Sequence, residues 1–371
     1  MPLQPKKYIA GLKACAHGGT NYAEFKELGI KPEDVLDFSV STNPFMPPPG
    51  IREMMQNIPI ERYPDSQSTE LTERLAERLK ISSENILVGS GTTELIRLIA
   101  QAYFRQRDNV LILEPTYGEY EVACRISGAR ALKHRALEED SFAPKMDEVS
   151  EIICQRRPRA VFICNPNNPT GKYLPRAEIE KILKACRDAL LVLDEAYVTF
   201  VENTWNPLDL IERFNLIVLR SMTKDYGLPG LRLGYAAASR DIIATLRAVM
   251  PPWSVNVIAQ ESGKAVLGQD NYLQETLVKV REAKRYLTGQ LTWLGFSVVP
   301  SDAHYFLVKV GDAKACRRTL LKQGVMVRDC TSFGLPEYLR VSPRTLPECE
   351  KLVATMKREI EKPGFQKERN R

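Results

Sequence analysis

Short apolar runs alternate with segments of helical periodicity over much of the chain. Six runs of four or five residues consist mostly of apolar side chains, at 85–88, 110–113, 160–164, 190–193, 216–219 and 233–237. Strands that are buried on both faces of a parallel sheet have this composition. Before and between these runs, apolar residues recur at helical spacing in 68–80, 94–104 and 176–187. The alternation predicts a doubly wound, mainly parallel α/β domain over residues 51–268.

The pattern changes after residue 268. A long charged helix is predicted near 274–294, and further helices at 314–323 and 347–361. Strands are predicted at 297–299, 305–310 and 325–327. Residues 269–371 are therefore expected to form a smaller α+β domain. Residues 1–50 have no regular pattern and include three consecutive prolines at 47–49, so we expect an irregular N-terminal arm that packs with the small domain.

Composition agrees with two domains. A chain of 371 residues exceeds what one hydrophobic core usually sustains, and its 44% hydrophobic residues are enough for a packed interior. The 52 basic residues outnumber the 46 acidic ones, for a net charge of +6. This mild excess suits small anionic substrates and does not require nucleic acid. The basic segment 362–371 is predicted to be a solvated end.

Cysteine and histidine usage predicts neither disulfides nor a zinc site. The eight cysteines include no CxxC pair, and several lie in apolar runs, as expected of buried thiols in a reducing compartment. None of the three histidines lies at metal-ligand spacing to another. No apolar stretch has the length of a membrane span. We therefore expect a cytoplasmic protein without a membrane partner.

Residues that follow the predicted strands are candidates for ligand binding, because ligands of open α/β sheets bind at the carboxyl ends of strands. The segment GSGTT at 89–93 opens a helix, where free amides and hydroxyls make an anion site; a glycine turn with a helix cap is the alternative. Neither GxGxxG nor the P-loop pattern is present, which excludes those nucleotide sites. Tyr117, after the second strand, fits stacking on a flat ring as well as simple packing.

Two further segments carry polar groups at strand ends. NPNNPTG at 165–171 combines three amides with two prolines, a costly turn unless an amide points at a ligand. LVLDEAY at 191–197 ends a strand in Asp194, and a buried carboxylate needs a partner. A protonated pyridine nitrogen is such a partner, and Tyr197 could then bind the phenolate oxygen of the same ring. The competing interpretation, an acidic box of a nucleotide hydrolase, lacks a phosphate loop.

The segment LRSMTKDYGLPGLRLGY at 219–235 places Ser221, Lys224 and Arg232 at the end of the fifth strand. A lysine whose pKa is lowered by burial forms Schiff bases, while a hydroxyl and a guanidinium hold phosphate. The group therefore suits a phosphorylated aldehyde. By itself the motif is weak, because most such lysines lie on solvated faces.

Together these residues resemble a known family. In this order and spacing, Asn168, Asp194, Tyr197, Ser221, Lys224 and Arg232 are similar to the motif set of the fold-type-I, pyridoxal-phosphate-dependent enzymes of the class I/II aminotransferase group. The likeness extends from His17 to about Arg344. Five segments narrow it to the threonine-phosphate decarboxylases, which resemble histidinol-phosphate aminotransferases: HGG at 17–19, LDFSVSTNP at 36–44, ERYPD at 61–65, LPGLRLGY at 228–235 and PWSVN at 252–256.

The resemblance implies a role for each matched residue. Lys224 would hold pyridoxal 5'-phosphate as a Schiff base, and Asp194 would bind its pyridine nitrogen. Asn168 and Tyr197 would bind the ring oxygen, and Tyr117 would stack on the ring. The cofactor phosphate would lie against Gly91, Thr92, Ser221 and Arg232, with Tyr63 reaching over from the second subunit of a homodimer.

The resemblance also implies how a small phosphorylated amino acid is bound. Arg340 would clamp its carboxylate beside Asn168. Arg328, His17 and the backbone of Gly18 and Gly19 would face its phosphate. One residue departs from the pattern: Ser41 stands where the decarboxylases commonly have asparagine, which points to a related substrate such as serine phosphate.

Three hypotheses about function follow. The first is decarboxylation of L-threonine O-3-phosphate to 1-aminopropan-2-ol phosphate, for the nucleotide loop of cobalamin. The alternative is an aminotransferase of the histidinol-phosphate type, because which bond at Cα breaks depends on its angle to the ring and motifs do not reveal that angle. The third is a non-catalytic binding protein that kept the fold, which the intact cofactor set and the lack of a DNA-reading module disfavour.

Overall fold

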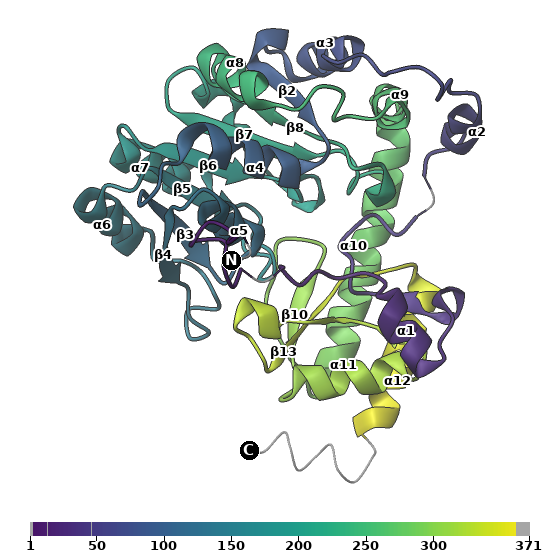
Figure 1. The fold of residues 1–371 in the computed structure, drawn as a ribbon. Helices are drawn as coiled ribbons and strands as arrows, with labels where there is room; N and C mark the ends of the chain where they lie inside the picture. Colours follow the sequence, from purple (N-terminus) through teal and green to yellow (C-terminus); the bar gives the residue numbers. More distant parts are fainter. Residues whose placement is uncertain (1–2, 13, 46, 361–371) are drawn as a thin grey trace.

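The computed structural model describes residues 3–12, 14–45 and 47–360, and Figure 1 shows them in two domains connected by a long helix, α10 (Asp270–Trp293). The 24 residues of α10 give it a length of about 36 Å. The basic segment 362–371 and residue 361, the last of the final predicted helix, lie outside the described residues.

A seven-stranded sheet forms the centre of the large domain, in the order β2-β8-β7-β6-β5-β3-β4. The strands are β2 (Ile86–Gly89), β3 (Asn109–Glu114), β4 (Arg130–Arg135), β5 (Ala160–Cys164), β6 (Leu190–Asp194), β7 (Leu216–Ser221) and β8 (Gly234–Ala237). Strand β8 runs antiparallel to β2 and β7, and the other neighbours are parallel. The predicted mainly parallel sheet is confirmed, and four of its strands end at one edge with Glu114, Cys164, Asp194 and Ser221.

Helices cover both faces of this sheet, which explains its continuous apolar strands. On one face lie α4 (Thr92–Tyr103), α5 (Glu119–Ile126) and α8 (Arg240–Val249). On the other lie α6 (Met146–Arg156) and α7 (Arg176–Cys186). Neighbouring residues of one strand alternate between the two cores: Val161 packs with α6 and α7, and Phe162 packs on the opposite face. A third core joins α3 (Thr69–Leu79) and α9 (Val257–Val266) to β2 and α10.

The small domain has a four-stranded antiparallel sheet in the order β12-β13-β10-β9. Its strands are β9 (Ser297–Val298), β10 (Phe306–Lys309), β12 (Arg328–Asp329) and β13 (Tyr338–Val341). Helices α10, α11 (Ala313–Leu321) and α12 (Leu346–Ile360) pack with it around one core. The N-terminal arm joins this domain through β1 (Leu36–Asp37), which pairs in parallel with β11 (Val325–Met326).

The prediction that residues 1–50 are irregular is wrong at α1 (Tyr22–Leu28), which lies beside α11 and α12 in Figure 1. The Asn21 side chain accepts hydrogen bonds from the first free amides of this helix, and Gly29 ends it with a φ of 67°. Phe25 is buried against Leu321 and Met326 of the small domain. The helix was not predicted, because its seven residues include one buried apolar side chain and so show little periodicity in the sequence. A short helix α2 (Ile51–Gln56) follows the proline segment.

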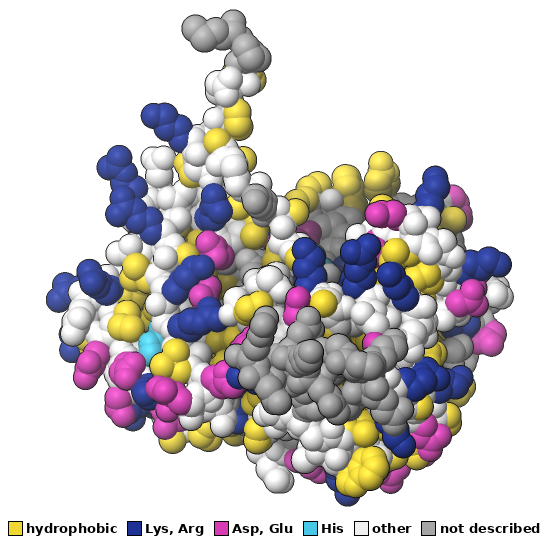
Figure 2. Space-filling view, turned by 90° about the horizontal axis from the view of Figure 1, so that it is seen from below, with side chains coloured by type: hydrophobic (Ala, Val, Ile, Leu, Met, Phe, Trp, Pro, Cys, Tyr) yellow, Lys and Arg dark blue, Asp and Glu magenta, His cyan; other side chains and the backbone are white. Residues whose placement is uncertain are grey.

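The face drawn in Figure 2 carries charges of both signs. There, Lys and Arg side chains are interspersed with Asp and Glu. None of the helices within the described residues combines the length and the apolar character that crossing a bilayer requires.

Candidate active site

A cavity of about 450 Å³ lies where the arm and the two domains meet. His17 of the arm, Lys224 of the large domain and Arg340 of the small domain all line it. Of the site residues predicted from sequence, the cavity brings together fourteen: His17, Gly18, Ser41, Gly91, Thr92, Tyr117, Asn168, Asp194, Tyr197, Ser221, Lys224, Arg232, Arg328 and Arg340. Gly19 and Tyr63 lie outside its wall.

Asp194 and Lys224 are a buried acid and a buried amine in the same cavity wall. Asp194 ends β6 and is 3% exposed. Its Oδ2 accepts a hydrogen bond from the Tyr120 hydroxyl at 2.8 Å and its Oδ1 one from the Ala196 amide at 3.1 Å. Burial nevertheless raises the pKa of Asp194 to about 6. A cationic group inside the cavity would lower this pKa again and keep the carboxylate ionised. Asp194 is therefore suited to bind a cationic partner.

The pKa of Lys224 is lowered to about 8 by burial and then by the positive charges of Arg232 and Arg340. A larger share of this amine than of an ordinary lysine is therefore neutral near pH 7, which a nucleophilic amine requires. Its backbone carbonyl accepts the amide N–H of Asn43 at 2.8 Å, which fixes the arm against the segment after β7.

This pKa shift predicts how stability depends on pH. Between pH 8 and 10.5, the unfolded chain keeps the proton on Lys224 that the cofactor-free folded protein has lost, so unfolding free energy rises with pH there. Below pH 8 the folded state bears the cost of a buried cation. Lys224→Met in the cofactor-free protein should therefore raise the unfolding free energy at pH 7, by up to roughly 3 kcal/mol. Urea denaturation at pH 7 and pH 10 measures this. A gain that is absent at pH 7, or equal at both pH values, would contradict the assignment.

An anion cradle lies at the N-terminus of α4. Gly91 caps this 12-residue helix with a φ of 80°, and a Cβ there would lie 2.8 Å from an Nη of Arg232. Only glycine leaves room for the guanidinium at this position. Thr92 opens the helix, and the Ser221 hydroxyl lies 3.3 Å from that of Thr223 on the same cavity wall. Free helix amides, two hydroxyls and a guanidinium together can bind a phosphate.

Three further polar side chains line the cavity: Tyr117, Asn168 and Tyr197. The Tyr117 hydroxyl lies 3.0 Å from that of Thr93 on α4, and Tyr117 packs edge-on to Tyr120. Burial raises the pKa of Tyr197 to about 12, so this hydroxyl stays protonated and can donate. In the 165–171 turn, only Asn168 reaches the cavity. Asn165 bonds Leu174, and Asn167 bonds Pro115 within the large domain.

Two arginines from neighbouring strands face the cavity. Arg328 on β12 and Arg340 on β13 are directly opposite in the antiparallel register, so both side chains project from one face of the sheet. Arg340 is 5% exposed and donates to Asn168 Oδ1 and, at 2.7 Å, to the Ser39 carbonyl. Its Nε has no hydrogen-bond partner within the described part of the chain. Burial and the charge of Arg340 lower the pKa of Arg328.

The arm forms part of the cavity wall. Arg328 donates to the Ala16 carbonyl at 2.8 Å and so holds the backbone next to His17 and Gly18. Ser41 is buried and its Oγ lies 2.7 Å from Ser342 Oγ, which ties the arm to the small domain. Gly19 donates its amide to Ser39 Oγ at 2.9 Å, and its predicted contact with substrate remains a prediction.

Tyr63 is 80% exposed, outside the cavity, and stacks on Trp253 at 4.6 Å between ring centroids. Its predicted contact with the site of a second subunit remains a prediction. Sequence reasoning missed Tyr120, whose hydroxyl binds Asp194, and Thr223. Tyr120 lies three residues after Tyr117, and Thr223 lies directly before Lys224. A hydroxyl so close to a predicted site residue could have indicated both.

Comparison with known proteins identifies the family. The model of the family described as aminotransferase class I and II matches residues 33–356, most of the chain. The chain belongs to this family. It is 35% identical to the histidinol-phosphate aminotransferase of Moorella thermoacetica over 340 residues, which cover 90% of this chain and 86% of the relative. It is 32% identical to that of Methanocaldococcus jannaschii, over 93% of this chain and 94% of the relative.

Solved structures of the family have the same fold. Histidinol-phosphate aminotransferase from Clostridium acetobutylicum superposes with a TM-score of 0.79 at 25% identity, over 87% of this chain and 98% of that one. L-threonine-O-3-phosphate decarboxylase from Porphyromonas gingivalis superposes with a TM-score of 0.76 at 28% identity, over 88% of this chain and 99% of that one. The fold-type-I architecture expected from the sequence is thus confirmed.

The cofactor of this aminotransferase family is pyridoxal 5'-phosphate, as predicted. The cavity fits this group: the guanidinium beside Gly91 and the first amides of α4 suit its phosphate, and Asp194 suits its ring nitrogen. Lys224 is the buried amine that can bind its aldehyde.

Proposed function

We propose that this family member acts at the Cα of a small amino compound that carries a phosphate. The opposed pair of Arg328 and Arg340 carries this proposal. Like charges directly opposite each other in a sheet are destabilising, and here one of the two is buried as well. A substrate with anionic groups at the cavity face of the sheet would offset that cost. Arg340 is the deep anion site, and Arg328 with His17 forms a second one nearer to solvent.

When bound, pyridoxal phosphate supplies an aldehyde for the amino group and a ring that accepts the electron pair freed at Cα. The residues of the chain do the rest. Asp194 keeps the ring nitrogen protonated, and Tyr117 and Tyr197 fix the plane of the ring. Lys224 moves the proton at Cα, with its amine held in the buried cavity wall. His17, Gly18 and Ser41 of the arm line one side of the cavity and so limit the access of water.

The curated relatives favour amino transfer from histidinol phosphate. Eight such aminotransferases share 31–36% identity with this chain. In this reaction Lys224 would take the proton from Cα of the substrate. A dicarboxylate amino acceptor would then use the same two arginines.

The decarboxylation of L-threonine O-3-phosphate expected from the sequence stands as the second candidate. The five segments that narrowed the resemblance support it, as does the 28% identity to the decarboxylase structure. Here the carboxylate would leave as carbon dioxide and Lys224 would give a proton to Cα. A phosphate at one arginine and a carboxylate at the other match this substrate. Ser41 stands where the decarboxylases commonly have asparagine, and its Oγ lies next to that of Ser342. Serine phosphate is therefore a further substrate to test.

One substrate panel separates the two reactions. The cofactor-loaded protein is incubated with threonine phosphate, serine phosphate or histidinol phosphate, each with and without 2-oxoglutarate. Amino transfer predicts glutamate from histidinol phosphate only when 2-oxoglutarate is present. Decarboxylation predicts carbon dioxide from threonine phosphate without it. No turnover of any of the three would refute the proposal as a whole.

Arg340→Ala should lower kcat/KM by about a hundredfold or more, because a buried charged partner of the substrate is lost. Arg340→Lys is the matched control: it keeps the charge but loses the forked donors that reach Asn168 and Ser39, so it should restore only part of the activity. Steady-state kinetics on the active substrate gives the result. An Arg340→Ala enzyme within threefold of wild type would exclude the anion-binding role.

We also propose that the enzyme is a homodimer in which Tyr63 reaches the partner's site. Ile60 at 74% exposed, Tyr63 at 80% and Trp253 at 47% leave apolar surface uncovered in a single chain. Light scattering coupled to gel filtration should give twice the chain mass. A monomer at working concentration would exclude this arrangement.

A further inference from the structure

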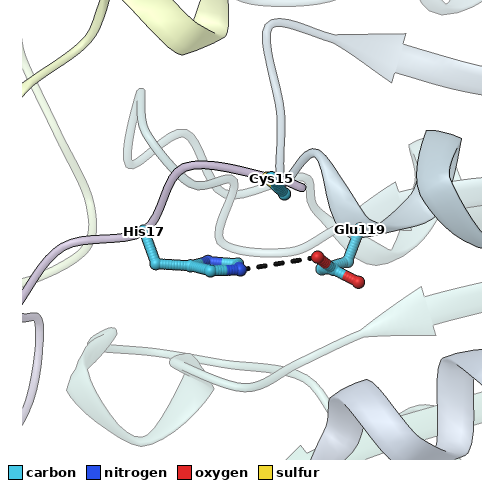
Figure 3. A group of neighbouring side chains, drawn as sticks. All are labelled: Cys15, His17 and Glu119. Carbon is cyan, nitrogen blue, oxygen red and sulfur yellow. Dashed lines mark ion pairs between the residues drawn. The ribbon is translucent and has the colours of Figure 1, made fainter. Parts of the chain in front are cut away.

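Three potential metal ligands meet where the cavity opens to solvent. Figure 3 shows the His17 ring pointing at the Glu119 carboxylate, with the Cys15 side chain beside them. His17 Nε2 is 3.4 Å from Glu119 Oε1, and the ligand atoms of all three residues lie within 4.8 Å of one another. Cys15 and His17 belong to the N-terminal arm, whereas Glu119 opens α5 of the large domain. The cluster therefore bridges two parts of the molecule.

The spacing is close to that of a tetrahedral zinc site. Zinc binds nitrogen and oxygen at about 2.0–2.2 Å and sulfur at about 2.3 Å, so neighbouring ligand atoms are roughly 3.3–3.7 Å apart. His17 and Glu119 already have this separation, and a small rotation of the Cys15 side chain would bring its sulfur closer. Gly118 makes room for that sulfur, because a Cβ at this position would lie 2.6 Å from Cys15 Sγ.

The surroundings hold the ligands in place. Arg97 donates to Glu119 Oε2, so this carboxylate keeps Oε1 free to face His17. Arg328 holds the arm through the Ala16 carbonyl, between Cys15 and His17. Outer contacts of this kind fix ligand orientation in metal sites. Two ionised ligands, thiolate and carboxylate, would balance a dication beside these two arginines.

We propose that Cys15, His17 and Glu119 form a three-ligand site for Zn²⁺ with its fourth position open, and that zinc bound there inhibits the enzyme. Binding displaces the thiol proton to solvent and forms the Zn–S bond, with no change of oxidation state. Inhibition follows because His17 turns from the substrate phosphate to the metal. This second half rests on the proposed function, whereas the binding itself does not. The sequence expectation of no zinc site considered only spacing between histidines, and Glu119 joins the arm only in the fold.

Calorimetric titration of ZnCl₂ into the pyridoxal-phosphate-loaded protein tests binding. Wild type should bind one zinc per chain, and X-ray absorption at the zinc edge should show one sulfur neighbour. Cys15→Ser should weaken zinc binding at least about tenfold. Losing a residue that only contacts a metal ligand already costs about tenfold or more in metal affinity, and Cys15 is itself a ligand. Cys154→Ser, an exposed thiol on α6, is the matched control and should bind as wild type. No saturable binding, or equal affinity in the two variants, would overturn the site.

Kinetics test the inhibitory half. Zinc should raise the KM of wild type and of Cys154→Ser while kcat stays unchanged, and EDTA should reverse the effect. Cys15→Ser should need at least about tenfold more zinc for the same effect. Stoichiometric binding without any change of KM would refute inhibition and leave binding standing. An enzyme with no turnover on the whole panel would refute the proposed function and inhibition together, while calorimetry still decides binding.

Discussion

Lys224→Ala is expected to lower kcat/KM by at least about 10³-fold, the range seen when the group that moves the proton or forms the covalent bond is removed. Its amine is buried in the cavity wall with a pKa of about 8, and the two arginines beside it cannot replace it because they remain protonated. The variant should still fold, because removal of a buried cation relieves a desolvation cost. It should also still bind pyridoxal phosphate through the anion cradle at Gly91, although without a covalent bond.

The measurement is steady-state kinetics on the substrate found in the panel, with cofactor content determined for each preparation. Lys184→Ala is a suitable control, because this lysine is exposed on α7 and should leave kcat/KM unchanged. If Lys224→Ala stayed within tenfold of wild type at full cofactor occupancy, another group would have to move the proton.

Asp194→Asn should lower kcat by about 10²–10⁴-fold, because an amide cannot keep the ring nitrogen of the cofactor protonated. The effect is electrostatic. Burial raises the pKa of Asp194 to about 6 in the cofactor-free protein, and a cationic ring nitrogen at its oxygens keeps it ionised. Asparagine has nearly the same shape and can still accept the hydrogen bond from Tyr120. We therefore expect the variant to fold.

Tyr120→Phe gives the graded control for this prediction. It removes the 2.8 Å hydrogen bond to Asp194 Oδ2 but keeps the carboxylate, so activity should fall by roughly 10- to 150-fold, the value of one hydrogen bond to a charged group. Cofactor binding of both variants is measured by equilibrium dialysis. An Asp194→Asn enzyme more active than Tyr120→Phe would contradict the proposed role of the carboxylate.

The sequence predicted the parallel part of the large domain well because its strands are buried on both faces. The run at 160–164, for example, has no polar position and matches β5 in both bounds. In contrast, β4 was missed. It is an edge strand with the sequence RALKHR, and most of its side chains are exposed or half-buried, so no apolar run marks it. Strands β12 and β13 were also missed, because the first has only two residues and the second, YLRV, is a run of four that a charged residue interrupts.

The site shows where motifs stop being informative. Spacing along the chain located Asp194, Lys224 and Arg232, because all three lie at the same edge of the sheet. Asp194 ends β6, Lys224 follows β7, and Arg232 precedes the antiparallel strand β8. It did not reveal that Arg328 and Arg340 are cross-strand neighbours, because β12 and β13 had not been predicted. Nor did it show that only Asn168 of three asparagines in its turn faces the cavity. Contacts such as Tyr120 with Asp194, or Cys15 with Glu119, arise from packing between segments far apart in sequence.

The most direct test of the account is to ask which side chain holds the cofactor. The pyridoxal-phosphate-loaded protein is reduced with borohydride, digested and analysed by mass spectrometry. We expect the reduced cofactor on the peptide that contains Lys224, and on that lysine alone. Cofactor present in the protein but fixed to a different lysine, or fixed to none, would contradict the central claim that Lys224 and Asp194 together bind and activate pyridoxal phosphate.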